Sequence, residues 1–167
     1  VMDKVRTAGS CLHLCGLVSD GGVHSHIRHL IGLIEMAAAK GVEAVFVHCF
    51  MDGRDTPPTS GLASMEELTA AMERIGRGRV ATVSGRYWAM DRDKRWDRVQ
   101  KAWDAMVCGE GATATDAVAC VQAAYGRGET DEFITPTMLV DNQGAAVGRI
   151  ADNDAVIFFN FRADRVR

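Results

Sequence analysis

The chain has 167 residues, of which 47% are apolar and 25% are charged, and its net charge is −3. This length favours one globular domain with a sizeable core, and the negative charge argues against a surface that binds nucleic acid nonspecifically. No apolar run approaches the roughly 20 residues that cross a bilayer, and the first residues lack the pattern of a signal peptide. We therefore expect a soluble, cytoplasmic protein that binds neither nucleic acid nor membrane.

The cysteines predict free thiols rather than a disulfide framework. Their number is odd, and three of them lie inside apolar runs, where a free cysteine behaves as a small hydrophobic residue. Reduced thiols also fit a cytoplasmic location. The five positions are Cys11, Cys15, Cys49, Cys108 and Cys120.

The first half of the chain alternates buried strands with amphipathic helices. Residues 11–18 (CLHLCGLV) are almost continuously apolar, as in a strand that is buried on both faces. After the loop SDGGVHS, apolar residues recur at spacings of three and four up to Gly41, which predicts a helix: Ile27, Leu30, Ile31, Ile34 and Ala38. Residues 44–51 (AVFVHCFM) predict a second strand, and a second helix follows the loop DGRDTPP, with Thr56 or Ser64 as its N-cap.

The second half repeats this strand–helix unit once, and a different order of predicted elements follows. Residues 79–84 predict a third strand, and a helix follows with Trp96, Val99, Trp103, Met106 and Val107 on one face. A fourth helix is expected over residues 115–125, then a hairpin over residues 138–150 around the turn DNQG, and a final strand over residues 155–161. We therefore predict one α/β domain over residues 1–167, with a mostly parallel but mixed sheet and helices on both faces.

Cationic side chains follow four of the predicted strands. Arginine supplies fifteen of the nineteen basic residues, and its planar guanidinium suits carboxylate and phosphate better than lysine does. Ligands of open α/β sheets bind beyond the carboxyl ends of the strands, where these loops gather. A site for a small anion is therefore expected at this edge, formed by His24, Arg54, Arg86, Arg92, Arg95, Arg162 and Arg165.

Acidic residues in the same loops leave two interpretations open. They either balance the arginines in a structural ion-pair network or hold them in position for a more negative ligand; the acids are Asp20, Asp52, Asp55, Asp91, Asp93 and Asp164. Gly21, Gly22, Gly53 and Gly85 favour a ligand, because glycine lets the backbone approach it closely. The Gly-Lys-Ser/Thr ending of a phosphate-binding P-loop is absent from the sequence.

The histidines raise the alternative of a metal site. His24, His26 and His29 fall within six residues, but their spacing, without neighbouring thiolates or carboxylates, does not favour zinc. We expect His24 to donate to an anion at the start of a helix, and His26 and His29 to be ordinary surface residues. His13 and His48, inside strands, are expected to be core histidines with satisfied hydrogen bonds.

Five segments resemble, in this order, those of the cofactor-independent (2,3-bisphosphoglycerate-independent) phosphoglycerate mutases: LVSDGGVHSH, DGRDTPP, SGRYWAMDRDKRWDRV, DEFITPT and DNDAVIFFNFRADR. They span residues 17–165, and so many long motifs in order do not arise by accident. Trp88 stands where the family often has a second tyrosine, which is a conservative difference. The chain looks like the substrate-binding (phosphotransferase) domain of these enzymes.

The resemblance also implies roles for individual residues. His24 is expected to contact the transferred phosphoryl group. Arg54 and Asp55 are expected to contact the glycerate, with Asp55 as a candidate general acid/base. The family motifs imply a clamp around the carboxylate and phosphate, formed by Arg86, Arg92, Arg162 and Arg165.

As an activity, the resemblance implies an isomerase that interconverts 3-phosphoglycerate and 2-phosphoglycerate in glycolysis and gluconeogenesis. A phosphatase-like domain of the same polypeptide, to which none of these residues is similar, would carry a serine nucleophile that becomes phosphorylated and two divalent metal ions, usually manganese. This chain would itself hold no metal or other cofactor and would be inactive alone. Its partners would be 2- or 3-phosphoglycerate and the missing domain.

Two other classes of function stay open at this stage. The first is a stand-alone module that binds phosphorylated acids without catalysis. The second is a metal-dependent hydrolase that uses the histidine cluster. A flanking metal-binding domain would exclude the first alternative, and stoichiometric zinc in the purified protein would favour the second.

Overall fold

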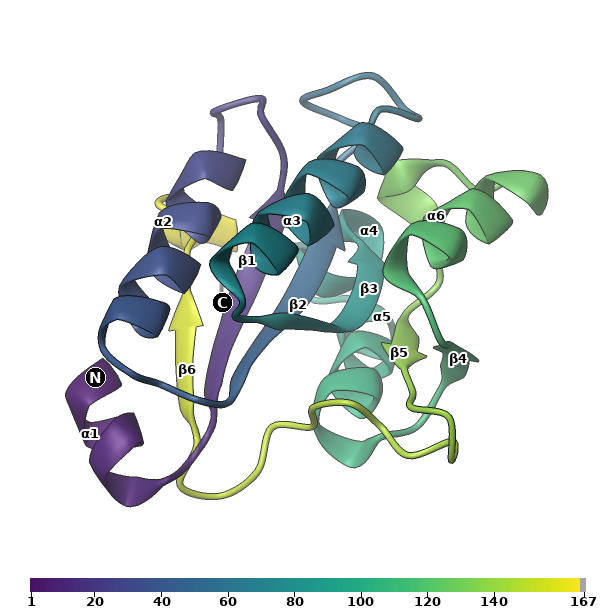
Figure 1. Ribbon diagram of the computed structural model, residues 1–167. Helices are drawn as coiled ribbons and strands as arrows, with labels where there is room; N and C mark the ends of the chain where they lie inside the picture. Colours follow the sequence, from purple (N-terminus) through teal and green to yellow (C-terminus); the bar gives the residue numbers. More distant parts are fainter. Residues whose placement is uncertain (166–167) are drawn as a thin grey trace.

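The computed structural model describes residues 1–165, and within them six strands form one sheet in the order β4-β5-β3-β2-β1-β6 (Figure 1). Strands β3, β2, β1 and β6 are parallel; β5 is antiparallel to β3, and β4 is parallel to β5. This mixed, mostly parallel sheet confirms the predicted fold class. The strands are β1 (Leu12–Val18), β2 (Val45–Met51), β3 (Arg79–Gly85), β4 (Ala112–Ala114), β5 (Thr137–Leu139) and β6 (Ala155–Phe158).

Helices cover both faces of the sheet. In Figure 1, α2, α3 and α6 lie in front of the strands, and α4 and α5 lie behind them. Leu14 and Leu30 belong to the larger apolar cluster in front, whereas Leu17, Phe50 and Met90 belong to a smaller one behind. The helices are α1 (Met2–Ala8), α2 (Ile27–Ala39), α3 (Gly61–Ile75), α4 (Arg86–Ala89), α5 (Trp96–Trp103), the π-helix η1 (Asp104–Cys108), α6 (Ala117–Gly126), and the 3₁₀ turns η2 (Asp131–Phe133) and η3 (Ala163–Arg165).

The three predicted strand-helix units are present, and their boundaries follow local chemistry. Every residue of β1 is buried, which explains why its sequence is apolar almost throughout. The chain leaves α2 through Gly41 with a positive φ of 71°, as expected for a glycine that follows a helix. The N-cap prediction for α3 was wrong: α3 begins after Ser60, whose hydroxyl donates to the carbonyl of Pro57 and closes the preceding turn.

The predicted hairpin over residues 138–150 forms only in part. Beyond β5, the pairing is reduced to a single bridge between Val140 and Ala146, and residues 145–150 form no second strand. The chain instead turns along the sheet, where the backbone of Gly148 packs against the ring of Phe46. The antiparallel neighbour that β5 does have is β3, so the mixed character of the sheet has a different origin from the one predicted.

The ends of the chain also differ from the prediction. The final strand stops at Phe158 rather than residue 161, because Asn160 leaves the ladder and its side-chain oxygen accepts the backbone N–H of Leu17 at 2.9 Å. The short elements α1 and β4 were not predicted. All five cysteines carry free thiols, as predicted. Among the described helices, none combines the length and the apolar character needed to cross a bilayer.

Candidate functional site

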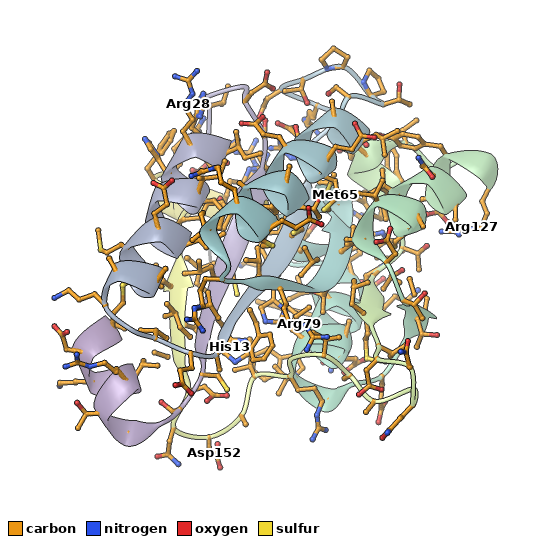
Figure 2. The ribbon with its side chains drawn as sticks, in the orientation of Figure 1. His13, Arg28, Met65, Arg79, Arg127 and Asp152 are labelled. Atoms are coloured by element: carbon orange, nitrogen blue, oxygen red, sulfur yellow. The ribbon has the colours of Figure 1, made fainter. Side chains whose placement is uncertain are left out.

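The loops that leave β1, β2, β3 and β6 gather at one edge of the sheet, the upper edge in Figures 1 and 2, where Arg28 is labelled. Parallel strands deliver their carboxyl ends to the same edge, so residues far apart in sequence meet there. The residues singled out from the sequence fall in these loops: His24 after β1, Arg54 and Asp55 after β2, Arg86 and Arg92 after β3, and Arg162 and Arg165 after β6.

Arg86 is the buried centre of this site. It begins α4 directly after β3, and its side chain is only 3% exposed. Its Nη1 donates to Asp52 Oδ1 and to Asp55 Oδ2, both at 2.7 Å. A guanidinium does not lose its proton on burial, so it needs nearby carboxylates. Arg86 therefore belongs to a structural ion-pair network, which was one of the two interpretations left open.

Asp52 is the most thoroughly satisfied acid of the network. Its Oδ2 accepts the hydroxyl of Ser19 at 2.6 Å, and its Oδ1 accepts the backbone N–H groups of Arg54 and Asp55 as well as Arg86. Burial alone would raise the pKa of Asp52, but the bonds from Ser19, Asp55 and Arg86 hold it below its ordinary value. Asp52 thus fixes the loop after β2 and is not available to a ligand.

His24 and Asp55 lie beside Arg86 with capacity left for a ligand. The Nε2 of His24 is 3.5 Å from Asp55 Oδ2, and its Nδ1 is buried without a hydrogen-bond partner among the described residues. Burial, and then the positive charge of Arg86, lower the pKa of His24. The imidazole is therefore neutral near pH 7, and one of its nitrogens lacks the bond that a buried polar atom normally makes.

Positive charge exceeds negative charge at the open side of the site. Arg92 and Arg162 share one carboxylate, Asp164, at 3.3 and 3.2 Å. Arg54 reaches Glu132 at 3.3 Å. These three arginines are about half exposed, so their ion pairs contribute little stability and leave the guanidiniums accessible.

Arg165 has the least compensated charge. Its Nη1 donates to the backbone carbonyl of Met90 at 2.9 Å, and its Nε has no partner among residues 1–165. Burial, together with the charges of Arg92 and Arg86, lowers the pKa of Arg165 below its ordinary value. Five arginines line a single hollow of about 60 Å³: Arg54, Arg86, Arg92, Arg98 and Arg165.

Two functional neighbours were missed from the sequence. Glu132 comes from η2, and Arg98 comes from α5, where it stacks on the Tyr87 ring at 3.9 Å and reaches Asp91 at 3.5 Å. The only available signal was their place inside the segments DEFITPT and SGRYWAMDRDKRWDRV. Arg95, expected in the anion site, is the exposed residue at the N-cap position of α5, where its side chain makes no capping hydrogen bond, and it does not line the hollow.

Two of the glycines permit close packing within the chain. A Cβ at Gly85 would collide with the backbone carbonyl of Glu132, and one at Gly53 would lie 2.9 Å from the Asp131 side chain. Gly53 also has a positive φ of 67°. These glycines let the loops after β2 and β3 pack closely against η2.

The histidine cluster does not form a metal site in the part of the chain that the structure describes. His26 is the N-cap of α2, and its Nδ1 accepts the backbone N–H of Arg28 at 3.2 Å. His29 is exposed on the helix, and the His26 and His29 rings are 6.1 Å apart. Their ligand atoms do not converge with a third group, which removes the support for a hydrolase built on this cluster.

A larger cavity of about 470 Å³ lies elsewhere, between α3, the start of α6 and the segment after β5. Its lining contains one arginine, Arg79, but three acids, Glu73, Asp116 and Asp141. This balance of charge does not suit an anion, so size alone does not identify the anion site.

Comparison with known proteins gives one consistent result. The family model described as "BPG-independent PGAM N-terminus" matches residues 1–167. The chain is 57% identical over 166 residues to the 2,3-bisphosphoglycerate-independent phosphoglycerate mutase of Thermomicrobium roseum, and 54% identical over 166 residues to that of Myxococcus xanthus. In both alignments 99% of this chain is covered, against 32% of the relative.

A solved structure agrees in fold over almost the whole chain. It belongs to the Leishmania mexicana phosphoglycerate mutase, crystallised at low cobalt concentration, and matches with a TM-score of 0.94 and 35% identity over 99% of this chain and 32% of that one. The chain therefore spans about a third of the length of the relatives it matches. By its sequence over the full length and by its fold, it belongs to the family of N-terminal domains of BPG-independent phosphoglycerate mutases.

Proposed function

We propose that this chain is the substrate-binding domain of an enzyme that interconverts 3-phosphoglycerate and 2-phosphoglycerate, and that its arginines hold the substrate. The observation that carries the proposal is the shortage of acid on the open side of the site. Among the described residues, Arg92, Arg162 and Arg165 have one carboxylate, Asp164, between them. Phosphoglycerate carries roughly 2.5 to 3 negative charges near pH 7 and would supply the missing compensation.

The buried part of the site would orient the substrate. With substrate bound, a protonated His24 would donate its Nδ1–H to a phosphate oxygen, the partner that Nδ1 lacks, while its Nε2–H faces Asp55. Asp55 would face a glycerate hydroxyl and accept or return its proton. Arg86 and His24 would hold the Asp55 carboxylate in place during this step. The fixed network behind Arg86 therefore positions the groups that touch substrate, and the exposed arginines supply most of the attraction.

Retention of glycerate is the second task of this domain. If the dephosphorylated acid escaped, the net reaction would be hydrolysis of the phosphate ester rather than isomerisation. Charge-assisted contacts from several guanidiniums, each contributing about 1.5 to 3 kcal/mol, would hold the acid through the reaction. Exclusion of water by a closed site would strengthen these contacts further.

The described residues of the arginine site do not fit divalent metal ions, because five guanidiniums line the hollow and two of its carboxylates, Glu132 and Asp91, are already paired with arginines. We assign the two divalent ions expected from the family, with manganese as the proposed metal, to the two thirds of the relatives' length that this chain does not cover. We assign the serine nucleophile and its phosphorylated form to the same part.

A stand-alone binding module is the competing function. It is disfavoured because this chain matches 32% of each enzyme that it resembles at more than 50% identity. We propose that the intact protein is the isomerase, located in the cytoplasm, and that the 167-residue chain alone has no mutase turnover. Turnover of 3-phosphoglycerate by the purified chain would contradict this assignment.

A titration of 3-phosphoglycerate into the chain, followed residue by residue by NMR, tests the site. We expect the largest shifts in the loops after β1, β2, β3 and β6, and weaker binding in the variants Arg92→Ala and Arg162→Ala. Arg74→Ala is the matched control, because Arg74 is also an exposed arginine paired with one acid, Glu35, but lies on α3. Shifts confined to other surfaces, or equal binding by all variants, would exclude the proposed site.

In the intact enzyme, Arg92→Ala and Arg162→Ala are each expected to lower kcat/KM roughly 30-fold, because a substrate charge loses its partner. This corresponds to a loss of about 2 kcal/mol of transition-state stabilisation. Near-wild-type kinetics for both variants would remove these arginines from the site.

A further inference from the structure

A second polar cluster lies at the opposite end of the sheet from the arginines, at the lower edge in Figure 2, where His13 is labelled. The side chains of His13, on β1, and His48, on β2, are fully buried, and His13 Nδ1 lies 2.9 Å from His48 Nε2. His48 Nδ1 lies 3.0 Å from the hydroxyl of Thr82, on β3. His13 Nε2 lies 3.2 Å from Asp154 Oδ2. These histidines have satisfied hydrogen bonds, as predicted, but Asp154 was not expected among their partners.

Three metal-ligating atoms converge at the outer end of this row. Cys11 Sγ, His13 Nε2 and a carboxylate oxygen of Asp154 all lie within 4.8 Å of one another. The carboxylate is held by the backbone N–H groups of Cys11 at 2.8 Å and of Ala151 at 3.0 Å. The imidazole is held by His48. Such outer bonds orient ligands toward a metal, and they are present here before any ion binds.

We propose that Cys11, His13 and Asp154 bind one divalent ion of the zinc class, with water as the fourth ligand. The donor set of one sulfur, one nitrogen and one oxygen suits Zn²⁺ or Co²⁺ rather than Mg²⁺ or Ca²⁺, which prefer oxygen alone. Cys11 is half-buried, so solvent reaches the side from which water would enter.

The charges and protons of the site balance. Cys11 gives up its thiol proton to solvent on binding, so one thiolate and one carboxylate neutralise the two positive charges of the ion. A neutral site is compatible with burial, whereas an unbalanced one is not. Tetrahedral coordination at bond lengths of about 2.0 to 2.3 Å places ligand atoms roughly 3.5 Å apart, so the Cys11 side chain needs to move inward by about 1 Å.

When the ion binds, metal ligation replaces the His13–Asp154 hydrogen bond, and the other two bonds of the row are kept with their direction reversed. Without metal, His13 Nε2–H donates to Asp154, His48 Nε2–H donates to His13 Nδ1, and Thr82 donates to His48 Nδ1. With metal on His13 Nε2, the row reverses: His13 Nδ1–H donates to His48 Nε2, and His48 Nδ1–H donates to Thr82. Each imidazole carries one proton in both arrangements. The distances along the row are compatible with both.

Cys11 distinguishes a metal site from a purely structural network. The row from Asp154 to Thr82 is complete through hydrogen bonds that do not involve the Cys11 side chain. A structural role therefore requires the histidines and Asp154 but not the thiol. A metal site requires all three, and Cys11→Ala separates the two without removing a bond from the buried row.

The test is a titration of the reduced 167-residue chain with Co²⁺ alone, then with Zn²⁺ in competition, monitored by absorbance. We expect one ion per chain and a thiolate-to-cobalt charge-transfer band. Cys11→Ala should remove the band and weaken binding roughly 100-fold or more, with unchanged circular dichroism. Cys108→Ala is the matched control, since Cys108 is exposed and stands apart from the cluster. It should keep both the band and the affinity.

His26→Gln is a second control, directed at the histidines near α2, and should also bind Co²⁺ normally. The proposal is overturned if no one-to-one complex forms, if Cys11→Ala keeps the affinity of the parent chain, or if Cys108→Ala or His26→Gln abolishes binding.

Discussion

The two ends of the sheet handle buried polar groups in different ways. At the end near His13, burial is accommodated by the loss of charge: burial, and then the neighbouring His13, lower the pKa of His48 to about 3. At the other end, Arg86 keeps its charge and is matched by Asp52 and Asp55. Histidine can release its proton at a moderate cost, but arginine cannot. An arginine site must therefore contain acids, and the excess of arginine over acid at this end supports the proposed anion site.

The largest expected effect is a loss of stability at the arginine end of the sheet. Arg86→Ala would leave Asp52 and Asp55 without their shared guanidinium, and should lower the free energy of unfolding by about 3 to 5 kcal/mol. Denaturant unfolding measures it. Arg74→Ala, at an exposed pair, should cost less than about 1 kcal/mol. A similar small cost for both variants would show that Arg86 does not stabilise this end of the sheet.

A backbone substitution tests how tightly the same end is packed. Gly85→Ala places a Cβ against the carbonyl of Glu132 and should destabilise the fold by about 1 to 3 kcal/mol. Gly32→Ala, inside α2 with open space around the added Cβ, should stabilise it by about 0.5 to 1 kcal/mol. Opposite signs in thermal or denaturant unfolding are the expected result, and a neutral Gly85→Ala would contradict the contact with η2.

At the histidine end, low pH is expected to reduce the stability of the fold. Since the pKa of His48 is lower in the folded chain than in the unfolded chain, the unfolded chain binds the extra proton below about pH 6.5. Stability is therefore retained above that pH and lost as pH falls from about 6.5 toward 3, by up to about 1.4 kcal/mol per pH unit from this group. His48→Gln should flatten the pH dependence of the unfolding free energy between pH 6.5 and 5. His29→Gln, at an exposed position, should not.

The smallest expected effect is a change in the pKa of His24, but not of the histidines at the far end, when a ligand binds. Bound 3-phosphoglycerate would neutralise Arg162 and Arg165, which contribute to the low pKa of His24, so this pKa should rise on binding. The pKa values of His13 and His48, at the far end, should not change. Titration of the imidazole signals by NMR, with and without ligand, measures both. An equal response from all three histidines would indicate a change of the whole fold rather than local binding.

Much of this arrangement was predictable from local patterns. The buried strands, the amphipathic helices and the loops that carry Arg54, Arg86 and Arg92 follow from hydrophobic spacing and from the rule that parallel strands end at one edge. The pairing within that edge was not predictable. Which acid meets which arginine depends on side-chain distances of a few ångströms, and spacing along the chain does not contain them.

Interactions between distant short segments account for the remaining differences. Strand β4 has only three residues, too few for a periodic pattern. The His13–Asp154 contact joins residues 141 positions apart, and no local signal marks it. Gly53 and Gly85 indicated close approach correctly, but the sequence did not reveal that η2 packs against them.

The direction of β5 has a consequence for how this domain tolerates change. Because β5 runs opposite to β3, the chain enters β5 at the edge where β3 leaves, and the backbone N–H of Gly85 donates to the carbonyl of Ile134 at 2.7 Å. Glu132, in the segment that precedes β5, therefore lies beside the arginines, whereas the other residues of this edge follow their strands. Insertions ahead of β1, β2 or β3 fall far from the proposed anion-binding edge, whereas a length change ahead of β5 would shift residues within it.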